Sequence, residues 1–287
     1  MHRRRHGHRH RHRTRLTRPV TTALTFDPEL AYPSYDRPFL ESWNGRFEAV
    51  FVALHPFFRM PDVDPVKDGY FTTPFATSTV GKDAFEEAER ERGPKTTEFL
   101  KRGTGGTRLL ASIGYPEDGW ETAQRITWAE VADQSGLGSR EEVGTALLAL
   151  IGALREPHPE KVAALVRYCE QTRTFPPAEG RFEELHLRPF LDLLGRAGSS
   201  AVLFQEEFDN EPVLSLTFAE AADRPWRGSL YSPDKSVLIV VDWDSYFTLV
   251  AGNRELLEPW IRDHAVDGFF ADETTTHHWW AGPANLN

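Results

Sequence analysis

Residues 236–252 read SVLIVVDWDSYFTLVAG, and this stretch decides the expected fold. Residues 237–241 are five apolar residues in a row, four of them β-branched, which is typical of a strand covered on both faces. Residues 242–245, Asp-Trp-Asp-Ser, supply a turn, and residues 246–251 then predict an antiparallel neighbouring strand. The stretch therefore predicts a hairpin at the structural centre of the C-terminal half.

The residues on either side extend this hairpin into a sheet with a helix. Gly252 and Asn253 predict the start of a helix that runs to about His264. Its apolar residues are expected to face the sheet: Leu256, Leu257, Trp260 and Ile261. The runs AVLFQEEF at 201–208 and PVLSLTF at 212–218 predict two further strands, and FEAVFVAL at 47–54 predicts a buried strand nearer the N-terminus.

The order of these elements predicts an α+β protein. Residues 19–46, rich in Pro, Tyr and Asp, indicate an extended arm draped on the body, and residues 82–92 indicate a charged helix. Residues 121–198 are helical in pattern, and residues 199–287 are rich in strands, which predicts a mostly antiparallel C-terminal sheet flanked by helices. We expect one integrated domain over residues 19–287, preceded by a separate tail at 1–18.

The clearest local pattern lies at residues 127–154. Thr127 with Glu130 forms a capping box, Ser139 with Glu142 forms another, and Gly136 stands where the first helix should end. In the second helix, an apolar stripe follows at helical spacing: Val143, Ala146, Leu147, Leu150, Ile151 and Leu154. The pattern predicts two helices joined by a short turn.

This helical pair resembles the helix-turn-helix unit of DNA-binding regulators, with Gly136 at the turn. The resemblance implies DNA reading by the second helix, whose first turn should offer hydrogen-bond donors to phosphates and bases. Here Arg140 is followed by Glu141 and Glu142, which repel the DNA backbone. We therefore favour a structural helical hairpin and keep DNA binding as an alternative.

The charge distribution also argues against a nucleic-acid partner. The net charge is −10, and residues 1–18 hold eight Arg and no acid, so the other 269 residues carry 25 basic and 43 acidic side chains. Such an acidic body suits a basic protein partner better than a nucleic acid. The tail itself, in which histidines alternate with arginines, predicts a disordered leader; metal scavenging or binding to polyanions is the alternative.

Few features of the sequence bear on the cellular compartment or on reactive side chains. The chain has a single cysteine, Cys169, on the apolar side of an expected helix, which predicts an inert core thiol. No apolar run is long enough to span a membrane, and no apolar core follows the basic start, so we expect a cytoplasmic protein with no membrane partner. His55 is the most catalytic-looking isolated histidine, although a structural role is favoured. No cofactor is predicted.

The C-terminal fifth holds the densest group of potential ligands, because GFFADETTTHHWW at 268–280 follows the hairpin. The candidate binding surface comprises Asp242, Trp243, Asp244, Asp272, Glu273, His277, His278 and Trp279. Its tryptophans suit a protein-recognition surface. Asp242, Asp272 and His277 are weaker candidates for metal ligands, at a spacing that matches no metal motif, and paired carboxylates suit acid–base catalysis. Acids capping turns and aromatics closing the core are the structural alternative.

The run at 232–252, the GFFADETTTHHWW segment and the helical pair together resemble an uncharacterised bacterial family known only as a domain of unknown function. The resemblance spans about residues 40–280 and implies a soluble bacterial protein without assigned catalytic residues. The final hairpin and helix also look, more loosely, like bacterial immunity proteins that neutralise toxins. We therefore expect a non-enzymatic interaction protein, of the immunity type in its narrower form; the alternatives are a metal-dependent enzyme and a DNA-binding regulator.

Overall fold

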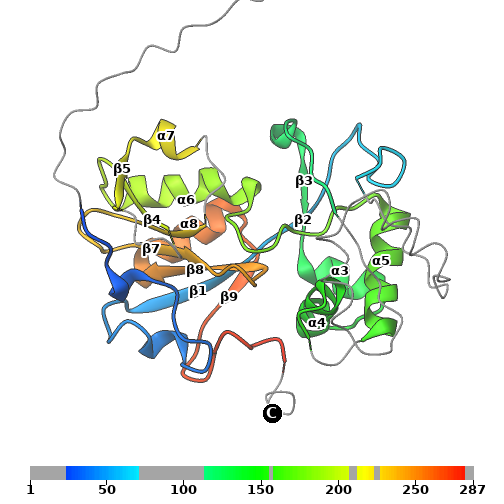
Figure 1. The fold of residues 1–287 in the computed structure, drawn as a ribbon, viewed down its shortest axis with the longest axis horizontal. Helices are drawn as coiled ribbons and strands as arrows, with labels where there is room; N and C mark the ends of the chain where they lie inside the picture. Colours follow the sequence, from blue (N-terminus) through cyan, green and yellow to red (C-terminus); the bar gives the residue numbers. More distant parts are fainter. Residues whose placement is uncertain (1–23, 71–112, 155–157, 207–211, 223–226, 282–287) are drawn as a thin grey trace, which may run out of the picture.

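The computed structural model describes residues 24–70, 113–154, 158–206, 212–222 and 227–281. It is an α+β protein, as the sequence predicts (Figure 1). The strands are β1 (Ala49–Leu54), β2 (Phe57–Arg59), β3 (Gln124–Ile126), β4 (Val202–Gln205), β5 (Leu214–Leu216), β6 (Gly228–Tyr231), β7 (Leu238–Val241), β8 (Phe247–Gly252) and β9 (Gly268–Phe270). The α-helices are α3 (Trp128–Ser135), α4 (Arg140–Ile151), α5 (Pro159–Thr172), α6 (Glu184–Arg196), α7 (Phe218–Ala222) and α8 (Arg254–His264).

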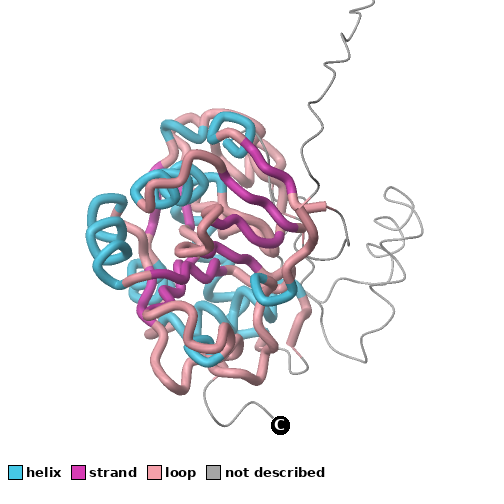
Figure 2. Tube along the Cα trace, turned by 90° about the vertical axis from the view of Figure 1, so that its left-hand side faces the viewer, coloured by secondary structure: helices cyan, strands magenta, loops and turns pink. Residues whose placement is uncertain are grey.

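Seven of the strands form one sheet in the order β5-β4-β6-β7-β8-β1-β9, and all neighbouring strands are antiparallel. The expected hairpin is its middle, because β7 pairs with β8 with Ile239 opposite Val250. The strands lie side by side in one layer (Figure 2). The sheet is not confined to the C-terminal part of the chain, since β1 lies between β8 and β9. Two short strands, β2 and β3, pair separately.

Both faces of the sheet are covered, which explains the unbroken apolar run in β7. Leu238 and Val240 join one apolar core, and Ile239 and Val241 join the other. Alternate side chains of a strand point to opposite faces, so a strand buried on both sides needs no polar residue. We call these the arm face and the helix face, after the segments that cover them.

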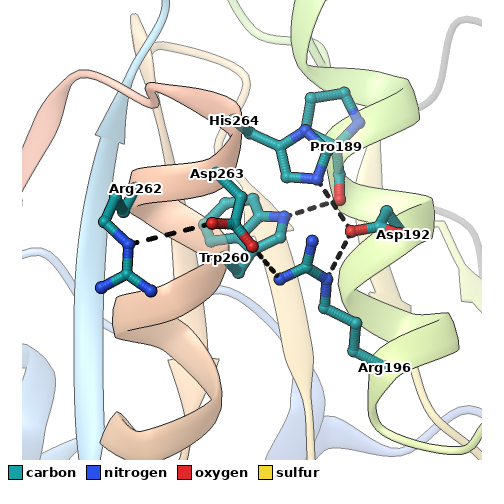
Figure 3. Close-up of polar contacts among 7 residues, drawn as sticks. All are labelled: Pro189, Asp192, Arg196, Trp260, Arg262, Asp263 and His264. Atoms are coloured by element: carbon teal, nitrogen blue, oxygen red, sulfur yellow. Dashed lines mark hydrogen bonds and ion pairs between the residues drawn. The ribbon is translucent and has the colours of Figure 1, made fainter.

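The helix face is covered by α6 and α8. Trp260 of α8 is fully buried, and its Nε1 donates to the carbonyl oxygen of Pro189 in α6 at 2.7 Å. At the surface, Arg196 lies 2.6 Å from Asp192 and 2.8 Å from Asp263, which connects the two helices, and His264 also contacts Asp192 (Figure 3). The expected helix after Asn253 is therefore confirmed, with Asn253 as its N-cap.

The arm face is covered by the two ends of the described chain. The arm, residues 24–47, contributes buried Leu30, Phe39, Trp43 and Phe47 to this core. It is fixed by Gln205, whose amide accepts from the backbone N–H of Asp27 and donates to its carbonyl, and by Ser229, which donates to Leu30. Figure 1 shows the arm (dark blue) and the tail after β9 (red) on the side of the sheet opposite α6 and α8.

The helical pair predicted at 127–154 is confirmed, except that α4 ends at Ile151, so Leu154 of the expected stripe lies beyond the helix. Thr127 and Ser139 cap α3 and α4, and Gly136 ends α3 in the left-handed conformation. However, α4 is buried on most sides: Val143, Gly144, Thr145, Ala146, Leu147, Leu148 and Leu150. A Cβ added to Gly144 would lie 2.9 Å from the Cβ of Trp280 in the tail. Helix α4 therefore packs inside the molecule, as the structural interpretation of the pair expects.

The sequence did not predict every element. The strands β2, β3, β6 and β9 were not expected, and β3 interrupts the middle segment that the pattern indicates to be helical. Three predicted segments lie outside the described residues: the tail at 1–18, the first residues of the arm at 19–23, and the helix expected at 82–92. None of the helices in the described part of the chain combines the length and apolar character that crossing a bilayer requires.

Candidate functional site

The turn between β7 and β8 is built around Asp242. This side chain is buried, and its Oδ1 accepts from the hydroxyl of Tyr35 at 2.7 Å and from the backbone N–H of Asp244 at 2.9 Å. The backbone N–H of Ser245 donates to the carbonyl oxygen of Asp242 at 3.2 Å and closes the turn. Asp242 thus positions the turn and joins it to the arm, and the next side chain, Trp243, points outward with 47% of its surface exposed.

The C-terminal segment after β9 brings a pair of histidines, His277 and His278, to the same residues of the arm. The ring of His277 stacks on Tyr35 with 3.9 Å between centroids, and its Nδ1 shares a hydrogen bond with the Tyr32 hydroxyl at 2.9 Å. Burial, with the neighbouring His278, lowers the pKa of His277 to about 3, so this ring is neutral at neutral pH. His278 meets Tyr35 edge-on at 5.8 Å. Both candidate histidines therefore contact Tyr35 of the arm, and Tyr35 in turn donates a hydrogen bond to Asp242 in the hairpin turn.

The arm, the β7–β8 turn and His278 line an open pocket of about 560 Å³, which we call the Trp243 pocket. It is lined by Tyr32, Pro33, Ser34, Tyr35, Asp36, Asp242, Trp243 and His278. Trp243 is one of three large hydrophobic side chains that are exposed in the described part of the chain, with Leu24 and Val66. Of the eight residues that the sequence singles out, the structure places Asp242, Trp243 and His278 at this pocket.

Acidic groups gather behind the turn. The loop 177–183 packs against it, because the N–H of Gly180 donates to Ser245 O at 3.0 Å and a Cβ at Gly180 would collide with the Trp243 carbonyl. Burial and the nearby carboxylates of Asp244 and Asp242 raise the pKa of Glu179 to about 7, against a lowering by Arg227. Burial and Asp242 likewise raise the pKa of Asp244.

The remaining candidates have structural partners of their own. Asp272 accepts from Thr274 and Thr275 within one turn, and these hydrogen bonds lower its pKa to about 2. Glu273 is exposed beside it. Trp279 packs against Phe269, Trp128 and Phe247, so it closes the core rather than the pocket.

The metal-ligand set proposed from the sequence does not assemble in this geometry. Within the described residues, no three or more His, Cys, Asp or Glu side chains gather in an arrangement that could hold a metal ion. The imidazole of His277 shares a hydrogen bond with Tyr32 and stacks on Tyr35. The carboxylate of Asp272 accepts a hydrogen bond from Thr275 in the same turn.

His55 lies in the core. It is fully buried, its Nε2 contacts Thr248 Oγ1 at 2.9 Å, and its Nδ1 contacts the carbonyl of Ala178 at 3.2 Å. Burial lowers its pKa to about 4, so the ring is neutral. The side chain of Glu183 is buried nearby. Its Oε2 accepts a hydrogen bond from the backbone N–H of Ala178 at 3.2 Å, and its Oε1 has no hydrogen-bond partner. His55 thus fixes the loop 177–183 to β8.

Sequence reasoning missed Tyr35, Asp36 and Glu179. The Tyr- and Pro-rich composition of the arm was the available signal, but nothing local connects residue 35 with residue 242. Cys169 is buried, and burial raises the pKa of its thiol, in agreement with an inert core position.

Comparisons with known proteins relate this chain to uncharacterised proteins. The chain is 22% identical over 194 residues to the uncharacterized protein YwbB of Bacillus subtilis (strain 168), a match that covers 58% of this chain and 86% of YwbB. No solved structure matches the chain. Neither the relative's name nor the family description mentions immunity, so that looser resemblance gains no support. A family model matches residues 110–281, from ahead of β3 to the tail, and the chain therefore belongs to the family described as "Protein of unknown function (DUF2711)".

Proposed function

We propose that this protein binds another protein through the Trp243 pocket. The observation that carries the proposal is the exposed indole of Trp243, held at the tip of a turn whose buried hydrogen bonds fix its position. Tryptophan is a frequent anchor of protein interfaces, because it removes much apolar surface from water when a partner covers it. An anchor that is already fixed loses little conformational entropy on binding.

The charge of the chain supports a basic partner. Residues 19–287 carry 25 basic and 43 acidic side chains, and three acids, Asp36, Asp242 and Asp244, stand at or next to the pocket. Complementary charge speeds association and disfavours acidic competitors. An immunity-type role against a basic toxin is the narrower form of this proposal.

The experiment compares matched variants at two exposed hydrophobic side chains. Full-length protein, Trp243→Ala and the control Val66→Ala are immobilised and exposed to lysate of the native host, and any retained protein is identified, purified and titrated back. We expect a protein whose retention and affinity fall at least roughly tenfold with Trp243→Ala, as for an interface anchor, and are unchanged with Val66→Ala. Equal behaviour of the three proteins would contradict the proposal, and the identity of the retained protein tests the immunity form.

A further inference from the structure

We propose that the Trp243 pocket takes the side chain of an arginine on the partner, with the guanidinium group lying against the Trp243 indole and paired with the Asp36 carboxylate. This inference rests on the proposed function and specifies the group that the pocket recognises.

The lining of the pocket has the composition of a cation site. It combines four aromatic rings, those of Tyr32, Tyr35, Trp243 and His278, with the carboxylates of Asp36 and Asp242. A cation over the face of an aromatic ring is attracted by the ring's quadrupole, and indole attracts it most strongly. Small apolar ligands would gain nothing from the carboxylates, and anions would be repelled by them.

The geometry favours arginine over lysine. Asp36 is an exposed residue of the pocket lining, and its Oδ1 accepts from Ser34 Oγ at 2.6 Å. A planar guanidinium can stack on an indole and donate to a carboxylate at the same time, whereas an ammonium acts as a point charge and is more strongly hydrated.

The electrostatic field around the turn favours a cation as well. Asp244 and Glu179 lie behind Asp242, and both titrate at raised pKa values because burial and the neighbouring carboxylates oppose their ionisation. The basic groups on these elements are Arg37, next to Asp36, Arg181, which lies over the Tyr115 ring, His278 in the pocket lining, and Arg227, which acts on Glu179. A bound guanidinium relieves the repulsion between the carboxylates, so its binding is coupled to loss of a proton from Glu179.

The test is calorimetric titration of the full-length protein with capped tetra-arginine, tetra-lysine and tetra-citrulline peptides. Citrulline has nearly the shape of arginine without its charge. We expect saturable binding of tetra-arginine, weaker binding of tetra-lysine and none of tetra-citrulline. Asp36→Asn keeps the acceptor for Ser34 and should weaken tetra-arginine binding roughly threefold to fivefold, as expected for one exposed charge. The matched control is Glu121→Gln, an exposed acid on another element, which should change nothing.

A second readout depends on Glu179. Affinity for tetra-arginine should rise from about pH 6 to about pH 8, as Glu179 loses its proton, and Glu179→Gln should flatten that rise. The arginine inference is overturned by equal binding of arginine and citrulline peptides, by lysine binding as tightly as arginine, by absence of tetra-arginine binding, or by equal losses in the Asp36 and Glu121 variants. If a retained host protein still depends on Trp243 while tetra-arginine does not bind, the proposed function stands and the arginine inference alone is wrong.

Discussion

The two faces of the sheet are covered in different ways. The helix face is closed by α6 and α8, amphipathic helices that pack through Trp260 and are joined at the surface by Arg196. The arm face is closed by the arm and the segment after β9, which meet where Tyr32 contacts His277, 245 residues away. The arm also reaches the β7–β8 turn, where Tyr35 contacts Asp242, 207 residues away. The helix face stabilises the fold, whereas the arm face also builds a pocket. A pocket can therefore arise where segments distant in the sequence meet over one face of a sheet.

The comparison predicts the largest loss of stability on the helix face. Trp260→Ala removes a fully buried indole and leaves the Pro189 carbonyl without its donor. We expect the free energy of unfolding, measured with urea, to fall by about 3–5 kcal/mol. Trp243→Ala, at an exposed indole, is the control and should change it by less than about 1 kcal/mol. Equal losses in the two variants would contradict the division between the faces.

A smaller loss is expected where the arm is fixed to the sheet. Gln205→Ala removes two hydrogen bonds to the backbone of Asp27 and leaves its N–H without a partner, although its carbonyl still accepts from Leu30 N, so the change should cost about 1–3 kcal/mol. Protease cleavage within the arm should also become faster, because a released arm is accessible. Gln124→Ala, at an exposed glutamine of β3, serves as the control, and the arm's role is refuted if both variants are cut at the wild-type rate.

The loop 177–183 connects the two faces through a buried acid. Burial raises the pKa of Glu183 to about 7, well above its ordinary value of 4.5. Its contribution to stability is therefore fully present below about pH 4.5 and is lost as the pH rises through 7. Glu183→Gln, which keeps an acceptor for Ala178 N, should be more stable than the wild type at about pH 8, by on the order of 1 kcal/mol.

Urea unfolding at a series of pH values measures this difference. The gap between Glu183→Gln and the wild type should shrink as the pH falls from about 7 toward the ordinary pKa of glutamate. A gap that is constant with pH would show that Glu183 does not titrate in this range. Glu184→Gln, at the neighbouring and less buried acid, is the matched control.

The smallest effect is expected for the ion pairs on the helix face. Arg196→Ala removes the contacts to Asp192 and Asp263 shown in Figure 3. All three side chains are about a third or more exposed, so water screens the pairs and the loss should be below about 1 kcal/mol. A thermal shift close to that of Trp260→Ala would mean that the surface network, and not the buried indole, holds the two helices together.

The sequence predicts what depends on neighbouring residues. The caps at Thr127 and Ser139, the glycine end of α3 and the β7–β8 hairpin all follow from short-range patterns, because each is satisfied within a few residues. Family membership was also expected from the C-terminal run. By contrast, β6 and β9 are only four and three residues long and contain glycine, so their patterns were too short to distinguish strands from turns.

The candidate site was predictable only in part, for the same reason. Asp242, Trp243 and His278 were named from local composition, and the structure places them at one pocket. Asp272 and Trp279 were named on equal grounds but serve a turn and the core. What separates the two groups is contact with Tyr35 and the rest of the arm. That contact depends on the path of the arm across the sheet, which no local pattern encodes.

The central claim, that recognition belongs to the arm face, is tested most directly by mapping the amide and indole NMR signals of the full-length protein during titration with tetra-arginine. Trp243→Phe assigns its indole signal among the eight tryptophans. We expect saturable shifts at Tyr35, Asp36, Trp243 and His278, with none at Asp192 or Asp263 on the helix face. Shifts centred on those two acids, or spread evenly over exposed carboxylates, would contradict it.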